Sequence, residues 1–483
     1  MWLLVGLTAV GAALRFATIT SQSYWLDEST TVHEMQMSFG ALLHAVRVNE
    51  TTPPLYFVLA WLWAKLFGTG EAGLRSLSAI AGVVVIPIAY LCGRELVSRR
   101  AGLVAAALTA VSPLMIWYSQ EARSYMLLVA FCAASFLFFA RGWKAPSGRN
   151  LALWALFSGL AVLTHFFAGF LVAPEAVLLL YRARNRAAVV AVGAVAIVQA
   201  AVLPLAVSDT THPLNWINAF PLAIRIQQVP TEFGVGALYQ SSLVSYGLLG
   251  AAALSACLIA LLVIGATRRE LIGAGVAAAL VAFVVLVPLA LAELGRDYYV
   301  ARNLMPAWIP LAVVIGAACT AARARPGGAV LAVVLLAAFV WAGVRINDNP
   351  QYQRPDWRGV AAALGRPAGT RAIIAYDGTF ATGPLAIYLH GIPWKGPTQA
   401  PPVSTAPVSV SEVDVVGNVW DTTPATLPAG VRLVARRRID NYLVERFRLS
   451  SAWDLPPTQI ALRAGGLLGP QSGDPGILIQ SQA

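Results

Sequence analysis

The sequence predicts an α-helical polytopic membrane protein with about 11 transmembrane helices and a small α/β domain toward its C-terminal end. Three observations predict this class. Of the 483 residues, 58% are hydrophobic and only 12% are charged. Many apolar runs of roughly 17–22 residues follow one another, each long enough to cross a bilayer as a helix. After residue 346 the composition becomes polar and proline-bearing, with short β-like runs.

The apolar runs are separated by loops rich in arginine. The runs lie at roughly 2–18, 52–68, 74–93, 101–118, 124–140, 150–164, 166–181, 187–207, 241–264, 271–292, 301–320 and 328–346. The arginine loops lie at 93–100, 141–149, 182–186, 267–270 and 321–325. Because arginine and lysine collect in cytoplasmic loops, the net charge of +11 indicates an orientation in the membrane and not nucleic-acid binding.

One run decides that orientation. Residues 51–67 are marginal in length, contain Lys65 and are rich in Trp and Tyr, which favours a position in the headgroup region. If this run crossed the membrane, every arginine loop would lie outside. If it lies in the interface, eleven helices cross and the arginine loops are cytoplasmic. The sequence favours the second arrangement, in a bacterial inner (plasma) membrane, with the loop 19–73 and the C-terminal domain extracytoplasmic.

This orientation places several polar segments on the outer face: the loop 19–51, the turns at 119–123 and 164–165, and the segment 293–302, joined by the loop 208–240. Acidic residues beside a membrane are costly and are usually kept for chemistry or ion handling. We therefore expect the reactive residues of the protein on this face.

Asp27 and Glu28 stand side by side in the first outer loop. Adjacent residues of a helix point about 100° apart, so the two carboxylates cannot aim at one atom. One can act as a general base while the other orients a partner or a metal. The alternative is that Asp27 caps a short surface helix and Glu28 lies in its first turn.

Further candidates lie in the other outer segments. Glu121 and Arg123 either pair at the membrane surface or face the same cavity as Asp27. His165 is either a satisfied interfacial residue or a member of that cavity. Arginine and tyrosine at helix ends are ordinary membrane anchors, but a phosphate at membrane level requires the same groups, a fixed cation with aromatic walls.

Four residues fit that second description. Arg296, Tyr299 and Arg302 lie at the outer end of a predicted helix, and Arg15 lies late in the first helix. Arg15 belongs with this group because an intramembrane charge needs a partner.

Two kinds of chemistry receive no support. The cysteines fall in apolar runs at irregular spacing, which predicts small core residues without disulfides or a thiolate metal site. The sequence contains no Walker A motif, no HExxH and no CxxC, so a nucleotide-dependent mechanism has no sequence support.

The C-terminal part divides into two regions. Residues 347–449 combine a short amphipathic helix with four β-like runs, which predicts a small extracytoplasmic α/β domain. Residues 450–483 are rich in Pro, Gly, Ser and Gln, which predicts a flexible tail. Residues 1–346 are expected to form the transmembrane catalytic domain.

Several motifs in the first 346 residues resemble one family in their order along the chain: WLDE, TPPLYF, SPLMIWYSQEARSYM, LTHFF and YVARNLMPAWIPL. They resemble the GT-C glycosyltransferases, and more narrowly the bacterial branch related to protein O-mannosyltransferases and lipid A aminoarabinose transferases. Many relatives carry His before the Pro-Pro pair, where this chain has Thr52.

The resemblance implies a GT-C-like fold, a polyprenyl-phosphate-linked sugar donor and an extracytoplasmic active site. It maps the acidic base onto Asp27, with Glu28 beside it, and the second acid onto Glu121, followed by Arg123. The candidate binding residues are Arg123, Arg302, Arg296, Tyr299, His165, Tyr56 of TPPLYF, and Arg15.

The predicted reaction is an inverting-type transfer of a hexosyl or pentosyl group to a hydroxyl of a protein, lipid or cell-wall glycan. No cofactor is required by the sequence, and a divalent metal stays open. The alternative is a transporter or lipid flippase that uses the intramembrane charges. Against it, the sequence shows no inverted repeat, and the polar residues collect at the outer face and not at the midplane.

Overall fold

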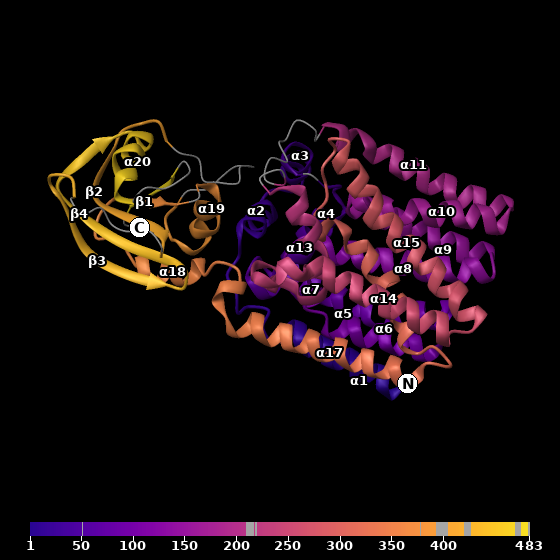
Figure 1. Cartoon of the computed structure of the whole chain (residues 1–483). Helices are drawn as coiled ribbons and strands as arrows, with labels where there is room; N and C mark the ends of the chain where they lie inside the picture. Colours follow the sequence, from indigo (N-terminus) through magenta and orange to yellow (C-terminus); the bar gives the residue numbers. More distant parts are fainter. Residues whose placement is uncertain are drawn as a thin grey trace. The chain divides into compact units, whose positions relative to one another are not determined.

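The computed structural model describes residues 1–50, 52–208, 217, 220–376, 378–392, 404–419, 427–468 and 475–481. The chain divides into two compact units (Figure 1). Unit 1 comprises Met1–Ile19 and Phe39–Asp348, and unit 2 comprises Thr20–Ser38 and Asn349–Ala483.

Unit 1 is built from helices. They are α1 (Trp2–Phe16), α3 (Phe39–Asn49), α4 (Leu55–Phe67), α5 (Glu71–Leu96), α6 (Arg99–Val111), α7 (Pro113–Ser119), α8 (Tyr125–Lys144), α9 (Gly148–Thr164), α10 (Gly169–Ala183), α11 (Arg186–Ser208), α13 (Leu222–Val235), α14 (Gly247–Gly265), α15 (Arg268–Glu293), α16 (Trp308–Cys319) and α17 (Arg325–Asp348). Short 3₁₀ segments are η1 (Phe166–Ala168), η3 (Gly236–Gln240), η4 (Ser242–Tyr246) and η5 (Ala301–Ala307).

Within the described residues, 8 helical segments are long and apolar enough to cross a membrane, and the bent pair α6–α7 makes up to 9. The helices α1, with 15 residues, and α9, with 17, are slightly shorter. The sequence predicts about eleven crossing segments. The 13 residues of α4 rise only about 20 Å, less than the apolar thickness of about 30 Å, which agrees with an interfacial position.

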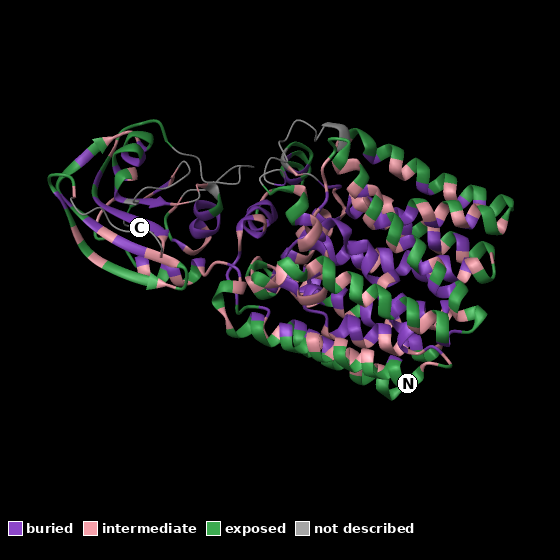
Figure 2. Cartoon of the chain, viewed as in Figure 1, coloured by how far each residue is buried: buried purple, intermediate pink, exposed green. Residues whose placement is uncertain are grey.

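The peripheral helices of unit 1 have many exposed residues (Figure 2), and many of these are apolar. Ile197 of α11 and Val263 of α14 are each 72% exposed, whereas nearly all of α16 is buried. Proteins that are surrounded by water rarely leave apolar surface of this extent uncovered. These faces therefore contact lipid, and the predicted class, a polytopic α-helical membrane protein, is confirmed.

The C-terminal ends of α5 and α8 meet through an ion cluster. The Glu95 carboxylate lies 2.8 Å from Arg94 Nη2, 3.3 Å from Lys144 Nζ and 3.9 Å from Arg141 Nε. Each of these side chains is partly exposed. The contacts bring two of the predicted arginine loops together at one end of the helices.

The fold of unit 2 is a five-stranded sheet with helices on both faces. Its elements are α2 (Leu26–Met35), η6 (Pro350–Tyr352), α18 (Trp357–Leu364), β1 (Arg371–Ala375), α19 (Thr379–Tyr388), β2 (Val408–Asn418), β3 (Val431–Ile439), β4 (Tyr442–Leu455), α20 (Pro457–Gly465), η7 (Gly466–Leu468) and β5 (Gly476–Gln480). The strand order is β3-β4-β2-β1-β5, with only β1 and β2 parallel.

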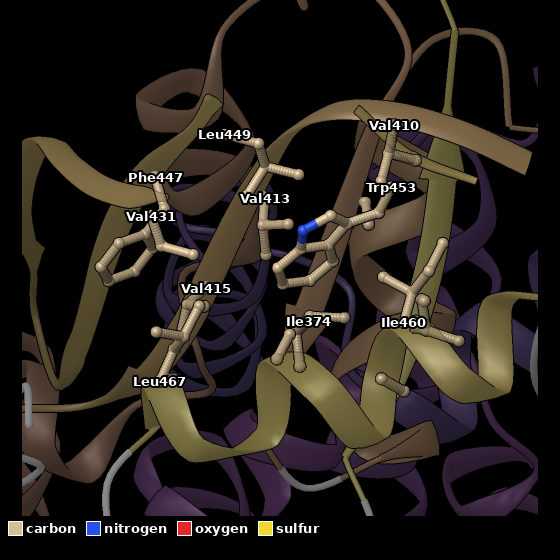
Figure 3. Packing of buried hydrophobic residues seen from close by; sticks show 14 residues of the cluster. Ile374, Val410, Val413, Val415, Val431, Phe447, Leu449, Trp453, Ile460 and Leu467 are labelled. Carbon is tan, nitrogen blue, oxygen red and sulfur yellow. The ribbon is translucent and has the colours of Figure 1, made fainter. Parts of the chain in front are cut away.

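Alternate residues of the strands serve two hydrophobic cores. Ile374 and Phe447 pack on one face with Ile460 of α20 (Figure 3). Ile373 and Val444 pack on the other face with α18 and α19. The predicted small α/β domain is thus present as a sheet covered on both sides.

Two boundaries differ from the predicted organisation. The region predicted as a flexible tail contributes the end of β4, the helix α20 and the strand β5. Strand β5 pairs antiparallel with β1, Ile477 lying opposite Ile374, and Gln480 accepts hydrogen bonds from the buried Arg371. The second difference is that residues 20–38, expected in the transmembrane domain, belong to unit 2.

Candidate active site

The break between α6 and α7 organises one end of unit 1. The two helices meet at an angle of 56° at Ser112-Pro113. Pro113 has no N–H group, so it cannot donate to the carbonyl of Thr109, its partner in a continuous helix. Arg15 supplies the missing donors: its Nη2 lies 2.9 Å from the Thr109 carbonyl and its Nη1 lies 2.9 Å from the Ala110 carbonyl. The Arg15 side chain is fully buried.

Two further bonds complete the role of Arg15. Its Nε donates to Ser119 Oγ at 3.1 Å, and its Nη1 donates to the Gly11 carbonyl at 2.9 Å. Gln120 Nε2 then donates to the Arg15 carbonyl at 3.0 Å and to Thr18 Oγ1 at 2.8 Å. The Arg15 side chain therefore fastens α1 to the break between α6 and α7, and its predicted contact with a phosphate stays a prediction.

Arg123, in that turn, forms a buried ion pair with Glu50 at the end of α3. Its Nη2 lies 2.8 Å from Glu50 Oε2 and its Nη1 lies 3.3 Å from Glu50 Oε1, a bidentate arrangement. The Arg123 guanidinium also lies 5.7 Å from the ring centroid of Phe57, which contacts the buried Tyr56 edge to face. The fork of Arg123 that was expected to hold a phosphate thus faces a carboxylate.

Two acids lie near each other beside Arg302. Glu121 is buried, and Glu232 of α13 is half-buried and accepts a hydrogen bond from Tyr118 Oη at 3.2 Å. The pKa of Glu232 is raised to about 7, chiefly because burial removes solvent; the Tyr118 hydrogen bond and the charge of Arg302 oppose the rise, and the charge of Glu121 adds to it. Glu232 therefore holds its proton over part of the physiological pH range.

His165 lies between aromatic rings and cations. Its ring stacks on Phe167 at 4.8 Å between centroids and lies 5.8 Å from Tyr125, over which the Arg302 guanidinium lies at 5.7 Å. Burial, and then the charges of Arg302 and Arg123, lower the pKa of His165 to about 3. The imidazole is therefore neutral, with Nδ1 accepting from the Phe167 amide at 3.4 Å.

The segment 296–302 is held by α13. Arg225 forms a bidentate pair with Asp297 and donates to the Tyr299 carbonyl at 2.9 Å. The Tyr299 side chain is buried in an apolar cluster with Val229. Arg296 is exposed. Its neighbour in the sequence, Asp297, forms its ion pair with Arg225. Tyr299 is therefore part of the packing, and Arg302 is the cation that this segment presents beside His165.

Asp27 and Glu28 lie in the first turn of α2, within unit 2. Glu28 is fully buried, and Asp27 is the only residue of the ten in α2 that is outside the buried class. The two carboxylates thus differ in access, in agreement with the expectation that they cannot serve one atom together. Among the residues that the structure describes, no group of three or more His, Cys, Asp or Glu side chains is arranged to hold a metal ion.

The structure therefore brings together five of the predicted residues in unit 1: Glu121, Arg123, His165, Arg302 and, within the same packing, Tyr56. Sequence reasoning missed Glu232 and the pairing of Arg123 with Glu50. The signal for Glu232 was a lone carboxylate in the stretch FPLAIRIQQVPTEFGVG. Glu50 was visible in the acidic loop, but its partner lies 73 residues away.

Solved structures of similar fold match nearly the whole chain. The structure of ArnT from Cupriavidus metallidurans in the apo state matches 97% of this chain and 99% of its own, with 14% identity and a TM-score of 0.56. The structure of the same protein bound to undecaprenyl phosphate matches with the same identity and coverage and a TM-score of 0.53. The chain thus shares the fold of ArnT over nearly its whole length, in agreement with the GT-C-like fold that the motifs imply.

A family profile matches a more limited part of the sequence. Residues 51–208 match the family described as dolichyl-phosphate-mannose-protein mannosyltransferase. This region contains Glu121, Arg123 and His165. No curated protein sequence matches the chain at a significant level.

Proposed function

We propose that this protein is a glycosyltransferase that moves a sugar from a polyprenyl-phosphate carrier to a hydroxyl group of an acceptor. The observation that carries the proposal is the gathering of Glu121, Arg302 and His165 at one end of unit 1. The fold match with ArnT covers 97% of this chain, and ArnT has been solved bound to undecaprenyl phosphate. A phosphate-linked sugar requires such a set: a cation for the phosphate and polar groups for the sugar.

The proposed reaction is a single displacement at the anomeric carbon. Asp27 accepts the proton of the acceptor hydroxyl, whose oxygen forms a bond to the anomeric carbon as the bond from that carbon to the phosphate oxygen breaks. The configuration inverts, and the polyprenyl phosphate leaves with the electron pair. Glu28, which is fully buried, supports the orientation of Asp27, and Glu121 orients groups of the substrate. The protein supplies position and charge stabilisation.

Arg302 is the proposed cation for the leaving phosphate. The bridging oxygen gains charge as the sugar leaves, and arginine can grip two phosphate oxygens at once. The neutral His165 and the ring of Tyr125 lie beside Arg302 and are proposed to line the donor site. Arg296, exposed at the end of α15, is a second cation for the lipid headgroup region. Arg123 acts through its pair with Glu50, which holds the turn that carries Glu121.

The proposed location is the bacterial inner membrane, with the site on the extracytoplasmic face. This orientation follows from the arginine loops between the crossing helices. Cysteines introduced at Ser38 and Gly148 test it. An impermeant thiol reagent added outside should label the first and not the second, and the opposite result would invert the orientation.

The function is tested with purified protein in vesicles and a panel of polyprenyl-phosphate sugars, both hexoses and pentoses, with vesicle lipids and cell-envelope extracts as acceptors. Consumption of one donor, with release of polyprenyl phosphate, is the expected result. If no donor of the panel is consumed while labelled lipid or sugar crosses the bilayer, the protein is a transporter and the proposal is wrong.

A further inference from the structure

Residues 20–24, which lead into helix α2 and are called its entry below, are held to the C-terminal part of unit 2 by hydrogen bonds. The Tyr24 amide donates to Tyr388 Oη of α19 at 2.7 Å. Ser23 Oγ donates to Asp356 Oδ1 at 2.9 Å and accepts from the Arg358 amide at 3.0 Å. Tyr24 and Ser23 are both nearly inaccessible to solvent.

The same attachment extends to the two residues before them. Arg358 Nη2 donates to the Thr20 carbonyl at 2.9 Å, and the Arg354 amide donates to Gln22 Oε1 at 2.9 Å. The partners lie more than 300 positions later in the chain. Residues 20–38 of the first outer loop therefore belong to one folded unit with the C-terminal domain.

Helix α2 has little stability of its own. It is ten residues long, shorter than the roughly 12–15 residues at which an isolated helix becomes marginal. Its sequence LDESTTVHEM contains a Thr-Thr-Val run, whose β-branched side chains disfavour a helix. The hydroxyls of Ser29 and Thr31 bond back to the carbonyls of Leu26 and Asp27, which adds nothing to the helical ladder. Its conformation therefore depends on packing and on the fixed entry at residues 20–24.

Asp27 lies three residues after Tyr24, in the first turn that this entry fixes. It is the single residue of α2 outside the buried class, so its carboxyl is partly accessible while the other nine residues of the helix are buried. A shift of the entry by an ångström would shift this carboxyl by a similar amount, and misplacement of that size can cost about 100-fold in rate.

We propose that the C-terminal domain carries the catalytic base Asp27, and that Tyr388 and Ser23 are positioning residues that set the place of Asp27 by holding residues 20–24, which lead into α2. This inference rests on the proposed function, because it assigns Asp27 a role in transfer. It goes beyond that function in assigning the small α/β domain a task in the reaction itself.

The test uses the full-length double variant Ser23→Ala/Tyr388→Phe, which removes the hydrogen bonds described above for both side chains and keeps the aromatic ring at position 388. The matched control is Thr382→Val, also on α19, whose hydroxyl bonds only within its own helix, to the Gly378 carbonyl at 3.1 Å. Two quantities are measured: amide hydrogen exchange of residues 20–30 and of β1, and kcat and KM for the polyprenyl-phosphate sugar. If the double variant does not fold, Tyr388→Phe alone is measured in the same way.

The proposal expects exchange at residues 20–30 to rise at least about tenfold while β1 stays protected. It expects kcat to fall at least about tenfold with KM for the donor within about twofold of wild type, because the donor-binding residues lie in unit 1. The control should match wild type in both quantities.

Two results would overturn the proposal. Unchanged exchange at residues 20–30 would mean that these bonds do not hold the entry to α2. Faster exchange with an unchanged kcat would mean that the attachment is structural only. A wild-type protein that transfers no sugar would instead refute the proposed function, while the exchange comparison would still decide whether the domain holds α2.

Discussion

Replacing Arg15 by methionine tests whether this arginine fastens the helix break or binds substrate. Methionine keeps an unbranched apolar stem of similar reach but removes every donor. The carbonyls of Thr109 and Ala110, each 2.9 Å from an Arg15 nitrogen, would lose that partner inside a fully buried site. A buried acceptor without a partner costs about 1–3 kcal/mol, so the two carbonyls together predict a loss of about 2–6 kcal/mol in the free energy of unfolding.

The assay is thermal unfolding of the purified protein in lipid nanodiscs, with Arg296→Met as the matched control because Arg296 is exposed. Arg15→Met should melt several degrees below wild type and the control should not. The reasoning is refuted if Arg15→Met melts with wild type while its KM for the polyprenyl-phosphate sugar rises about tenfold or more. In that case Arg15 binds the donor, as the sequence alone suggested.

Three further variants probe the polar end of unit 1. Arg302→Lys should lower turnover at least about tenfold, equivalent to about 1.4 kcal/mol of transition-state stabilisation, without lowering Tm; wild-type turnover would make Arg302 a membrane anchor. Glu50→Gln should lower the free energy of unfolding by about 3–5 kcal/mol, measured by thermal melting, because it leaves the buried Arg123 charge uncompensated, and adding Arg123→Met should recover part of the loss. His165 has a folded pKa of about 3, below its ordinary value near 6.5, so the unfolded state binds more protons as the pH falls between these values. Stability should therefore drop on acidification from about pH 6.5, by up to about 1.4 kcal/mol per pH unit, and His165→Gln should flatten that dependence in melting curves; an unchanged slope would contradict it.

The membrane fold was predictable from the sequence because it depends on local properties. Most of the apolar runs have the length of a crossing helix, and the run at 51–67, predicted to lie in the interface because of its Lys65 and aromatic residues, forms the short helix α4. The place of Glu121 in unit 1 was predictable for a similar reason, since a polar turn between apolar helices must lie at a helix end.

Pairing between distant segments was not predictable. The role of Arg15 depends on a proline almost one hundred residues later, which opens the carbonyls that Arg15 then satisfies. The grouping of residues 20–38 with the C-terminal domain depends on bonds such as that between Tyr24 and Tyr388. Strand β5 was hidden because the five residues GILIQ stand between polar flanks, and only the partner strand β1 makes them a strand.

The central claim, that Asp27 is the base of a sugar transfer, is tested most directly by turnover of Asp27→Asn with the donor that wild type consumes. The amide is nearly isosteric and cannot accept the proton, so transfer should fall at least about 100-fold, the lower range of what general base catalysis contributes, at unchanged Tm. Glu28→Gln, with its fully buried side chain, should retain more transfer than Asp27→Asn. Near-normal transfer by Asp27→Asn would contradict the account.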